Sequence, residues 1–390
     1  EALAELDVSN WNVGKVTTML STFYGCSSLT DLDVSNWNVS NVESMNMTFV
    51  YCGNLKELNV SNWDVGKVTN MSCMFYGCSL LADLDVSNWN VSSVNNMQGV
   101  FYNCHALNNL DVDSWDVSNV TNMNGLFKGC HTFTYLNFED WDVSNVTTFE
   151  NFLSSSNSYT GGMNLQSVDL SKWDTSSATS MAWMFYGCEW LTELDVSCLE
   201  VNNVTNMYHM FTDCFRLEKI NFTGWETSNL TNIDGMFNSC MALKTIDVSD
   251  FDTQKVTDMG QVFEYCGSLE EIIGLDKWDT SKVTTMSQMF NSYGGENGNK
   301  LKVVDLHNFD TSSLIDTEQM FNGCDNLETV YIGDGWNMSN ITDSANMFTG
   351  CTSIKGESGT VYDAANANDV TYANTETGYL TYKAAPTTNP

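Results

Sequence analysis

The stretch LTDLDVSNWNVSNVESMNMTFVYC, at residues 29–52, is the clearest copy of a unit that recurs along this chain of 390 residues. Its tryptophan, Trp37, lies 26 residues from the tryptophan of the unit before it and of the unit after it. A period of this length, carried by a whole segment, predicts a solenoid in which each repeat forms one coil. The series comprises Trp11, Trp37, Trp63, Trp89, Trp115, Trp141, Trp173, Leu199, Trp225, Phe251, Trp278, Phe309 and Trp336.

Two parts of the unit predict its local structure. Leu32 and Val34 alternate with polar residues, which is the period of a strand with one buried face. The segment 29–37 also matches the leucine-rich-repeat signature LxxLxLxxN, with tryptophan in place of the asparagine. Met45 and Phe49, four residues apart, suggest a helical or 3₁₀ turn on the opposite side of the coil.

The repeats therefore predict a leucine-rich-repeat solenoid, α/β or mainly β. We expect about thirteen stacked coils, with a parallel sheet on one face and short helical or 3₁₀ turns on the other. The solenoid is expected to cover residues 1–354, with a C-terminal cap at 355–384 and the start of a linker at 385–390, where the two prolines lie.

The charge of the chain limits its partners. Fifteen Lys and Arg residues stand against 49 Asp and Glu residues, which gives a formal net charge of −34 at pH 7. Such a charge repels nucleic acid and anionic membrane surfaces, and it favours cationic partners or metal ions. We find neither a signal peptide nor a long apolar run in the sequence, so we expect a fragment that does not insert into a membrane.

Two further rows are interpreted as structural. Leu199, Phe251 and Phe309 replace tryptophan in its row, which indicates a buried position that accepts large apolar groups and argues against a row that stacks on sugars. A cysteine closes most repeats, as Cys52 does, and we expect these thiols to be mostly reduced and to act as small buried apolar groups. Neither zinc nor a catalytic cysteine is expected, because ligand spacing and a repeated base are both missing from the sequence.

The outward positions of the predicted strand carry acids in most repeats. Like charges about 5 Å apart in water repel by about 0.8 kcal/mol, so such a face favours Ca²⁺ or a partner rich in Lys and Arg. The alternative is a solvated surface whose carboxylates accept backbone or serine hydrogen bonds between coils. The candidate binding face comprises Asp7, Asp31, Asp33, Asp83, Asp85, Asp111, Asp169, Asp195, Asp247 and Asp305.

Two repeats are longer than the others, with the extra residues at 154–164 and 291–300. Each carries an Asn-Ser-Tyr sequence followed by paired glycines. Insertions into a solenoid emerge as loops and often carry binding specificity, although they can also be tolerated variations in length. The candidate binding loops contain Tyr159, Gly161, Gly162, Tyr293, Gly294 and Gly295.

The repeat LxxLDVSNWDVSNVTNMxxMFxGC resembles that of the BspA-like leucine-rich-repeat surface proteins of bacteria, over about residues 3–354. The resemblance implies an extracellular protein, attached to the bacterial wall or membrane, that adheres to host proteins or to other cells. It brings no catalytic residues. The segment 359–383 also looks like the terminal cap of that family.

The sequence thus favours a non-catalytic cell-surface adhesin ectodomain that binds host or neighbouring-cell macromolecules through an extended face of the solenoid. No cofactor is expected apart from the Ca²⁺ considered above. Two alternatives remain: a carbohydrate-binding module that uses the insertion loops, so that glycans would be partners, and a purely structural stalk.

Overall fold

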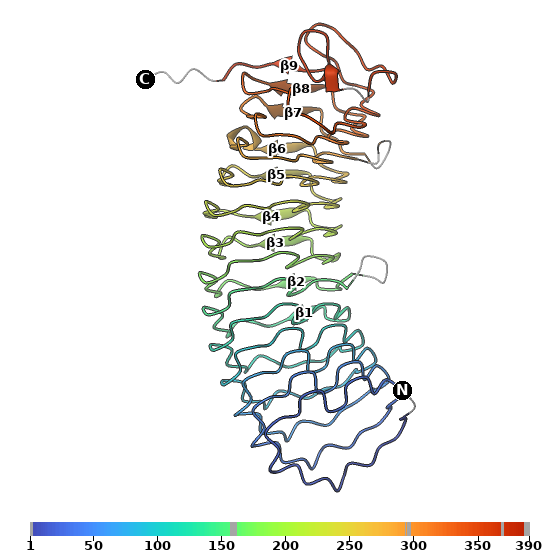
Figure 1. Ribbon diagram of the computed structural model, residues 1–390, viewed down its shortest axis with the longest axis vertical. Coiled ribbons are helices and arrows are strands. Elements are labelled where there is room, and N and C mark those ends of the chain that lie inside the picture. The colour runs from blue at the N-terminus through green and yellow to red at the C-terminus, as the bar shows by residue number, and fades with distance from the viewer. Residues whose placement is uncertain (1–2, 157–161, 293, 295–297, 368–369, 386–390) are drawn as a thin grey trace. The chain divides into compact units, whose positions relative to one another are not determined.

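The computed structural model describes residues 3–156, 162–292, 294, 298–367 and 370–385 (Figure 1). The chain divides into two compact units. Unit 1 comprises Glu1–Leu191 and Cys198–Glu200, and unit 2 comprises Thr192–Ser197 and Val201–Pro390. The predicted ends of the solenoid and its cap, at residues 354 and 384, are not tested by this division and stay predictions.

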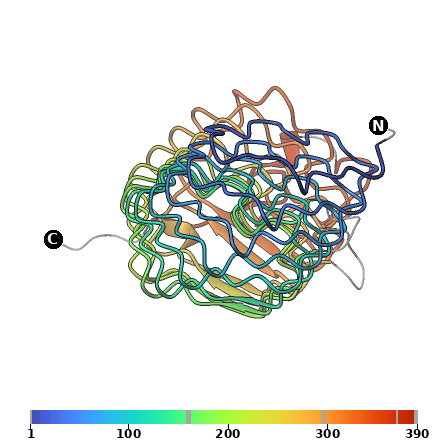
Figure 2. The ribbon, with the colours of Figure 1, turned by 90° about the horizontal axis from the view of Figure 1, so that it is seen from below.

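Unit 1 is a parallel β-solenoid. Its first column of short parallel pairings includes the bridge from Glu5 to Asp31 and the pairing of β1 (Tyr135–Leu136) with β2 (Ser167–Val168). We call the surface made by the outward residues of this column the strand face. A second column of parallel bridges runs through Thr18, Ser44, Asn70, Asn96, Asn122, Thr148 and Ser180. Figure 2 shows the chain of this unit as a series of overlapping loops.

Unit 2 repeats this plan with longer strands. β3 pairs with β4 and β5 with β6, while β7, β8 and β9 form one three-stranded sheet, all with parallel pairings. The second column runs from Asn206 to Asp343. The strands are β3 (Glu193–Asp195), β4 (Lys219–Asn221), β5 (Thr245–Asp247), β6 (Glu271–Ile273), β7 (Val303–Leu306), β8 (Thr329–Ile332) and β9 (Thr381–Tyr382).

Helix is nearly missing from the described residues, which contain the 3₁₀ helices η1 (Leu275–Lys277) and η3 (Val370–Tyr372). The prediction of a leucine-rich-repeat solenoid is therefore confirmed in its mainly β form. The helical or 3₁₀ turn expected at Met45 and Phe49 is present as separate turns with bonds of the 3₁₀ type, such as that from the N–H of Thr48 to the carbonyl of Met45 at 3.3 Å, and not as a continuous helix. The backbone N–H groups of Met45, Met47 and Phe49 donate to carbonyls of the next coil, at 2.8–2.9 Å, so they are not available for helical bonds.

The tryptophan row lies in the core, as predicted, from Trp37 to Phe309, whereas Trp11 is 49% exposed and Trp336 is half-buried. Trp37 and Trp63 are 4% and 3% exposed, and their rings stack with centroids 6.3 Å apart. The indole Nε1–H of Trp63 also donates to the carbonyl of Val34, at 3.2 Å, so this tryptophan is tied to the preceding coil. Burying a large apolar side chain contributes about 1.5 to 3 kcal/mol, which makes this row a principal source of stability.

The cysteine row is buried beside it. The thiol of Cys52 donates to the carbonyl of Phe23, at 3.2 Å, and Cys78 does the same to Phe49, at 3.1 Å. All thirteen cysteines are free thiols in the structure. Burial raises the pKa of Cys52 to about 12, which suits a structural thiol better than a nucleophile.

Candidate functional site

The strand face of unit 1 is acidic. Asp7, Asp31, Asp33, Asp83, Asp85, Asp111 and Asp169 are all exposed on it, as the sequence predicted. Parallel pairing sets Asp83 beside Glu57, and the acids line an open hollow of about 380 Å³. The carboxylates that line it are those of Asp31, Asp33, Glu57, Asp83 and Asp85.

The two acidic rows of this face differ in their hydrogen bonding. Asp33 accepts hydrogen bonds from the backbone N–H and the hydroxyl of Ser35, at 3.1 and 2.6 Å, and these bonds lower its pKa. Asp7 accepts the same two hydrogen bonds from Ser9. These bonds lie within one coil, whereas the alternative predicted from the sequence was hydrogen bonds between coils. Asp31 and Asp83 make no hydrogen bond or ion pair within the described part of the chain. Their row is therefore the one free to meet a ligand.

The strand face of unit 2 contains a larger hollow, of about 980 Å³, between β6 and β7. β6 and β7 belong to different sheets, although the backbone N–H of Lys300 still donates to the carbonyl of Leu269 at 2.9 Å. After β6 the chain passes through Gly274, whose φ of 83° is left-handed, into η1. This extra turn separates the two strands and opens the pocket.

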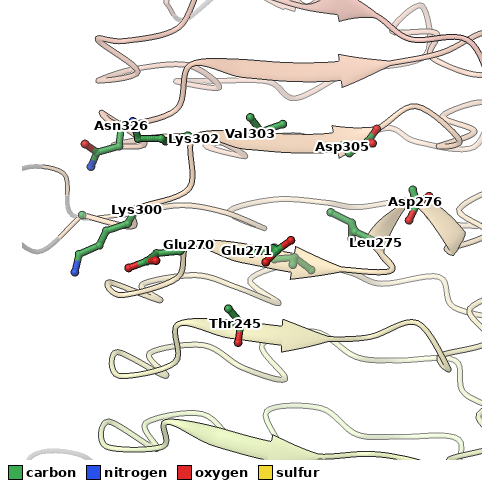
Figure 3. A pocket seen from close by; sticks show the side chains of 12 residues that line it. Thr245, Glu270, Glu271, Leu275, Asp276, Lys300, Lys302, Val303, Asp305 and Asn326 are labelled. Atoms are coloured by element: carbon green, nitrogen blue, oxygen red, sulfur yellow. The ribbon is translucent and has the colours of Figure 1, made fainter.

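Figure 3 shows how the charges of this pocket are placed. Glu270, Lys300 and Lys302 lie where the strands begin, and Asp276 and Asp305 lie where they end. The apolar part of the lining comes from Ile272, Leu275 and Val303. Lys302 forms an exposed ion pair with Glu328, at 3.0 Å. The pocket thus joins an apolar floor to a charged rim.

The acids predicted for the strand face of unit 2 have different surroundings. Asp195 and Asp247 are exposed, and each caps the following serine turn. Asp305 is half-buried; burial alone would raise its pKa, but hydrogen bonds from Lys383 and His307 outweigh this and lower it. His307 Nδ1 lies 2.7 Å from Asp305, and its side chain is 1% exposed. Of the predicted acids, Asp305 is the one that lines the pocket.

The candidate loops are described only in part. Tyr159, Gly161, Tyr293 and Gly295 lie outside the described residues, so their role stays a prediction. Gly162 is buried, and a Cβ placed there would come within 2.5 Å of the carbonyl of Gly187. Gly294 has a left-handed φ of 68°. Both positions require glycine for backbone reasons.

Two further properties of the described residues concern metal ions and membrane-spanning helices. Among the described residues, no cluster of three or more His, Cys, Asp or Glu side chains is placed to hold a metal ion. The prediction of Ca²⁺ on the acidic face is untested. None of the helices in that part of the chain has the length and apolar character that a membrane span needs.

Four overlapping segments, residues 1–83, 80–169, 159–272 and 240–362, match the family described as "Mycoplasma protein of unknown function, DUF285". The chain belongs to this family. The four successive matches confirm the resemblance to a bacterial repeat family, because together they cover the part of the chain in which the repeats occur. None of the curated proteins compared with this DUF285 chain matches it.

Solved structures with some similarity include a leucine-rich repeat protein from Bacteroides ovatus, which is 15% identical over 94% of this chain and 86% of that one, with a TM-score of 0.37. A leucine rich cell surface protein from Faecalibacterium prausnitzii is 17% identical over 80% of this chain and 76% of that one, with a TM-score of 0.40.

The pocket between β6 and β7 was not predicted from the sequence. Two signals for it are present: the interval from Phe251 to Trp278 is 27 residues, one more than the usual period, and Ile273 and Val303 occupy outward positions that are polar in most repeats. The extra residue forms part of η1, and the two apolar residues mark the change in the strand face.

Proposed function

We propose that this chain is a non-catalytic adhesin ectodomain of a bacterial cell surface, which binds proteins of host or neighbouring cells through its strand face. A leucine-rich-repeat solenoid is an architecture suited to protein binding, because it presents rows of side chains on extended faces. The observation that carries the proposal is the pocket of unit 2, where an apolar floor is surrounded by charges, as at the centre and rim of protein interfaces.

Two observations support a role without catalysis. The imidazole of His307 is paired with Asp305 but is 1% exposed, so a substrate has little access to it. The thiols of Cys104 and Cys240 are buried, and burial raises the pKa of each well above its ordinary value, so they are held in the unreactive protonated form.

The acidic faces support an extracellular protein partner that carries basic groups. A chain of formal net charge −34 attracts such groups over distances near the Debye length, about 8 Å at physiological ionic strength. The same charge weighs against nucleic acid as a partner.

The test is a binding assay of the labelled full chain on immobilised purified extracellular-matrix and cell-surface proteins, with a glycan array in parallel. We expect saturable binding to one or a few proteins that is lost when Asp31 and Asp83 are changed to Lys together with Glu271. Binding only to glycans, lost when residues 154–164 are trimmed, would favour the carbohydrate-binding alternative. Failure to bind any protein or glycan would favour a structural stalk.

A further inference from the structure

The pocket between β6 and β7 differs from the rest of the strand face in its apolar content. Leu275 is buried at its inner end, Ile272 is half-buried, and the side chain of Val303 is 50% exposed. Ile273, the next residue of the same strand, is also apolar and is 43% exposed. A volume of about 980 Å³ suits a side chain together with part of its main chain.

The charges of the pocket favour a cation. Among the described residues, four carboxylates line it against two ammonium groups, and two of these six charges already have partners: Lys302 pairs with Glu328, and Asp305 with Lys383. Two acids of the lining, Glu271 at the start of β6 and Asp276 beside Leu275, make no side-chain hydrogen bond or ion pair within the described residues. An ammonium or guanidinium group placed there would gain two carboxylate partners.

The form of that cation follows from the same geometry. Within the described residues, the acids of the pocket do not form a group that could hold a metal ion, and the apolar side chains of its floor supply no metal ligand. The described residues that line the pocket also include no aromatic ring on which a sugar could stack. Lys and Arg side chains carry an apolar stem and a charged end, which matches an apolar floor beside free carboxylates.

The chain already seats one lysine in this way on the same sheet. The ammonium group of Lys383, which follows β9, pairs with Asp305 and lies 5.5 Å from the centre of the Tyr331 ring on β8. A carboxylate that lines the pocket and an aromatic ring on β8 therefore hold a lysine at the β7 side of the pocket. A second copy of this chain is a poor occupant, because both copies carry a formal net charge of −34.

We propose that this pocket binds a Lys or Arg side chain from an apolar stretch of a partner protein. The stem lies against Leu275 and Val303, and the charged end lies between Glu271 and Asp276. This inference rests on the proposed function and specifies the chemistry of the partner at one place on the strand face.

The test uses the full chain and four capped synthetic nonapeptides. The first has a central lysine flanked on each side by Ile and Val, the second has glutamine in place of the lysine, the third has glutamate there, and the fourth keeps the lysine but has serine flanks. We expect the first peptide to bind at least about tenfold more tightly than the others in calorimetric titrations. Failure of the first peptide to bind, or equal affinity for the lysine and glutamine peptides, overturns the inference.

Variants locate the site. The double variant Glu271→Gln with Asp276→Asn should weaken binding of the lysine peptide about tenfold, to the level of the glutamine peptide. The matched control is Asp250→Asn with Glu376→Gln, which removes the same charge from exposed acids of unit 2 that do not line the pocket, and its affinity should stay within about twofold. Equal losses in both variants contradict the assignment. The peptide comparison itself uses the unaltered chain, so it stands even if a variant misfolds.

The outcomes separate this inference from the adhesin proposal. If the Glu271→Gln and Asp276→Asn variant still binds the surface proteins that the unaltered chain binds, with unchanged affinity, the pocket assignment fails and the adhesin proposal remains. If the unaltered chain binds no surface protein, the adhesin proposal fails first.

Discussion

The strand faces of the two units are built from the same repeat but offer different chemistry. In unit 1 the outward rows are acidic and line a shallow hollow around Asp31 and Asp83. In unit 2 apolar residues such as Ile273 and Val303 enter those rows, and the pocket between β6 and β7 is more than twice as large. Free charge without an apolar floor attracts a partner from a distance, whereas an apolar pocket with a charged rim holds it.

The two units also differ at the side remote from this face. In unit 1 the rings of Tyr24, Tyr51 and Tyr76 contact one another at the surface, with centroids 5.4–6.1 Å apart. In unit 2 the residue Glu264 is 4% exposed and accepts hydrogen bonds from two asparagines. Asp234 is half-buried nearby, so unit 2 carries a titratable interior where unit 1 has aromatic rings.

The largest expected effect tests what the units share. Trp115→Ala should lower the free energy of unfolding by about 3 to 5 kcal/mol, because it removes a buried indole from the stacked row. Trp115→Phe should cost less, since unit 2 accepts Phe251 in the same row. Urea unfolding followed by circular dichroism measures both. A cost below about 1 kcal/mol for the alanine variant would show that the row is not the main source of stability.

The next effect separates the units by pH. Burial and the charges of Asp258 and Glu264 raise the pKa of Asp234 to about 7, so folding favours its neutral form. The stability that Asp234 contributes to unit 2 should therefore fall as the pH rises from about 4 to about 7, by about 1 to 2 kcal/mol once screening of a partly exposed group is allowed for. His209 has the opposite effect, because burial lowers its pKa to about 4 whereas the unfolded chain takes up this proton below about pH 6.5, and the variant His209→Gln removes it from the comparison.

Unit 1 should behave differently in the same range. Serine hydrogen bonds lower the pKa of Asp33, so the stability that they contribute is lost only in stronger acid, as the pH falls through that lowered value. In the His209→Gln variant, hydrogen exchange near pH 5 and pH 8, corrected for the intrinsic rate, should show slower opening at the lower pH in unit 2 alone. Asp234→Asn should reduce that difference, and an equal pH response in both units would contradict this account.

A kinetic experiment sharpens the comparison of the strand faces. Changing Asp31 and Asp83 to Asn in unit 1 should lower the association rate with a basic partner about threefold and leave its dissociation rate unchanged, because these acids act at a distance. Val303→Ser in the pocket should instead raise the dissociation rate about threefold. Surface plasmon resonance at two salt concentrations measures both rates. The reverse assignment of effects would mean that unit 1 holds the partner.

The smallest expected effect concerns calcium. If the acidic face of unit 1 binds Ca²⁺, millimolar CaCl₂ should raise the melting temperature by about 1 to 2 °C above a NaCl control of equal ionic strength. The increase should be lost in the variant in which Asp31 and Asp83 are asparagine. Equal melting temperatures in CaCl₂ and NaCl would remove the calcium prediction and leave screening as the effect of the salt.

The repeated features of the fold could be predicted from the sequence, because a residue that recurs in every coil meets its own copies. This holds for Trp63 in the core and for Asp33 at the surface. The spacing of Met45 and Phe49 predicted a helical or 3₁₀ turn but could not show that it stops short of a helix, because every second N–H group of this segment donates to the next coil. Sequence spacing alone does not show where a backbone N–H donates.

The pocket was not predicted, because it arises where the repeat fails. The coil of β6 has one extra residue, the coil before β7 is longer than usual, and both border the pocket between these strands. The sequence does not show that the two irregularities lie side by side at one pocket. The different hydrogen bonding of Asp31 and Asp33 could not be predicted either. Both are outward acids in the sequence, and the hydrogen bonds from Ser35 to Asp33 distinguish them in the structure.

The most direct test of the strand face as the recognition surface is flow cytometry of the fluorescent full chain on intact epithelial cells. One variant carries Asp31→Lys, Asp83→Lys and Glu271→Lys on that face. Its control carries Glu43→Lys, Glu200→Lys and Glu376→Lys, which change the charge equally at exposed positions elsewhere. We predict that the control binds cells as the unaltered chain does and that the strand-face variant loses at least about nine-tenths of the binding. Equal binding by the two variants would contradict recognition through the strand face.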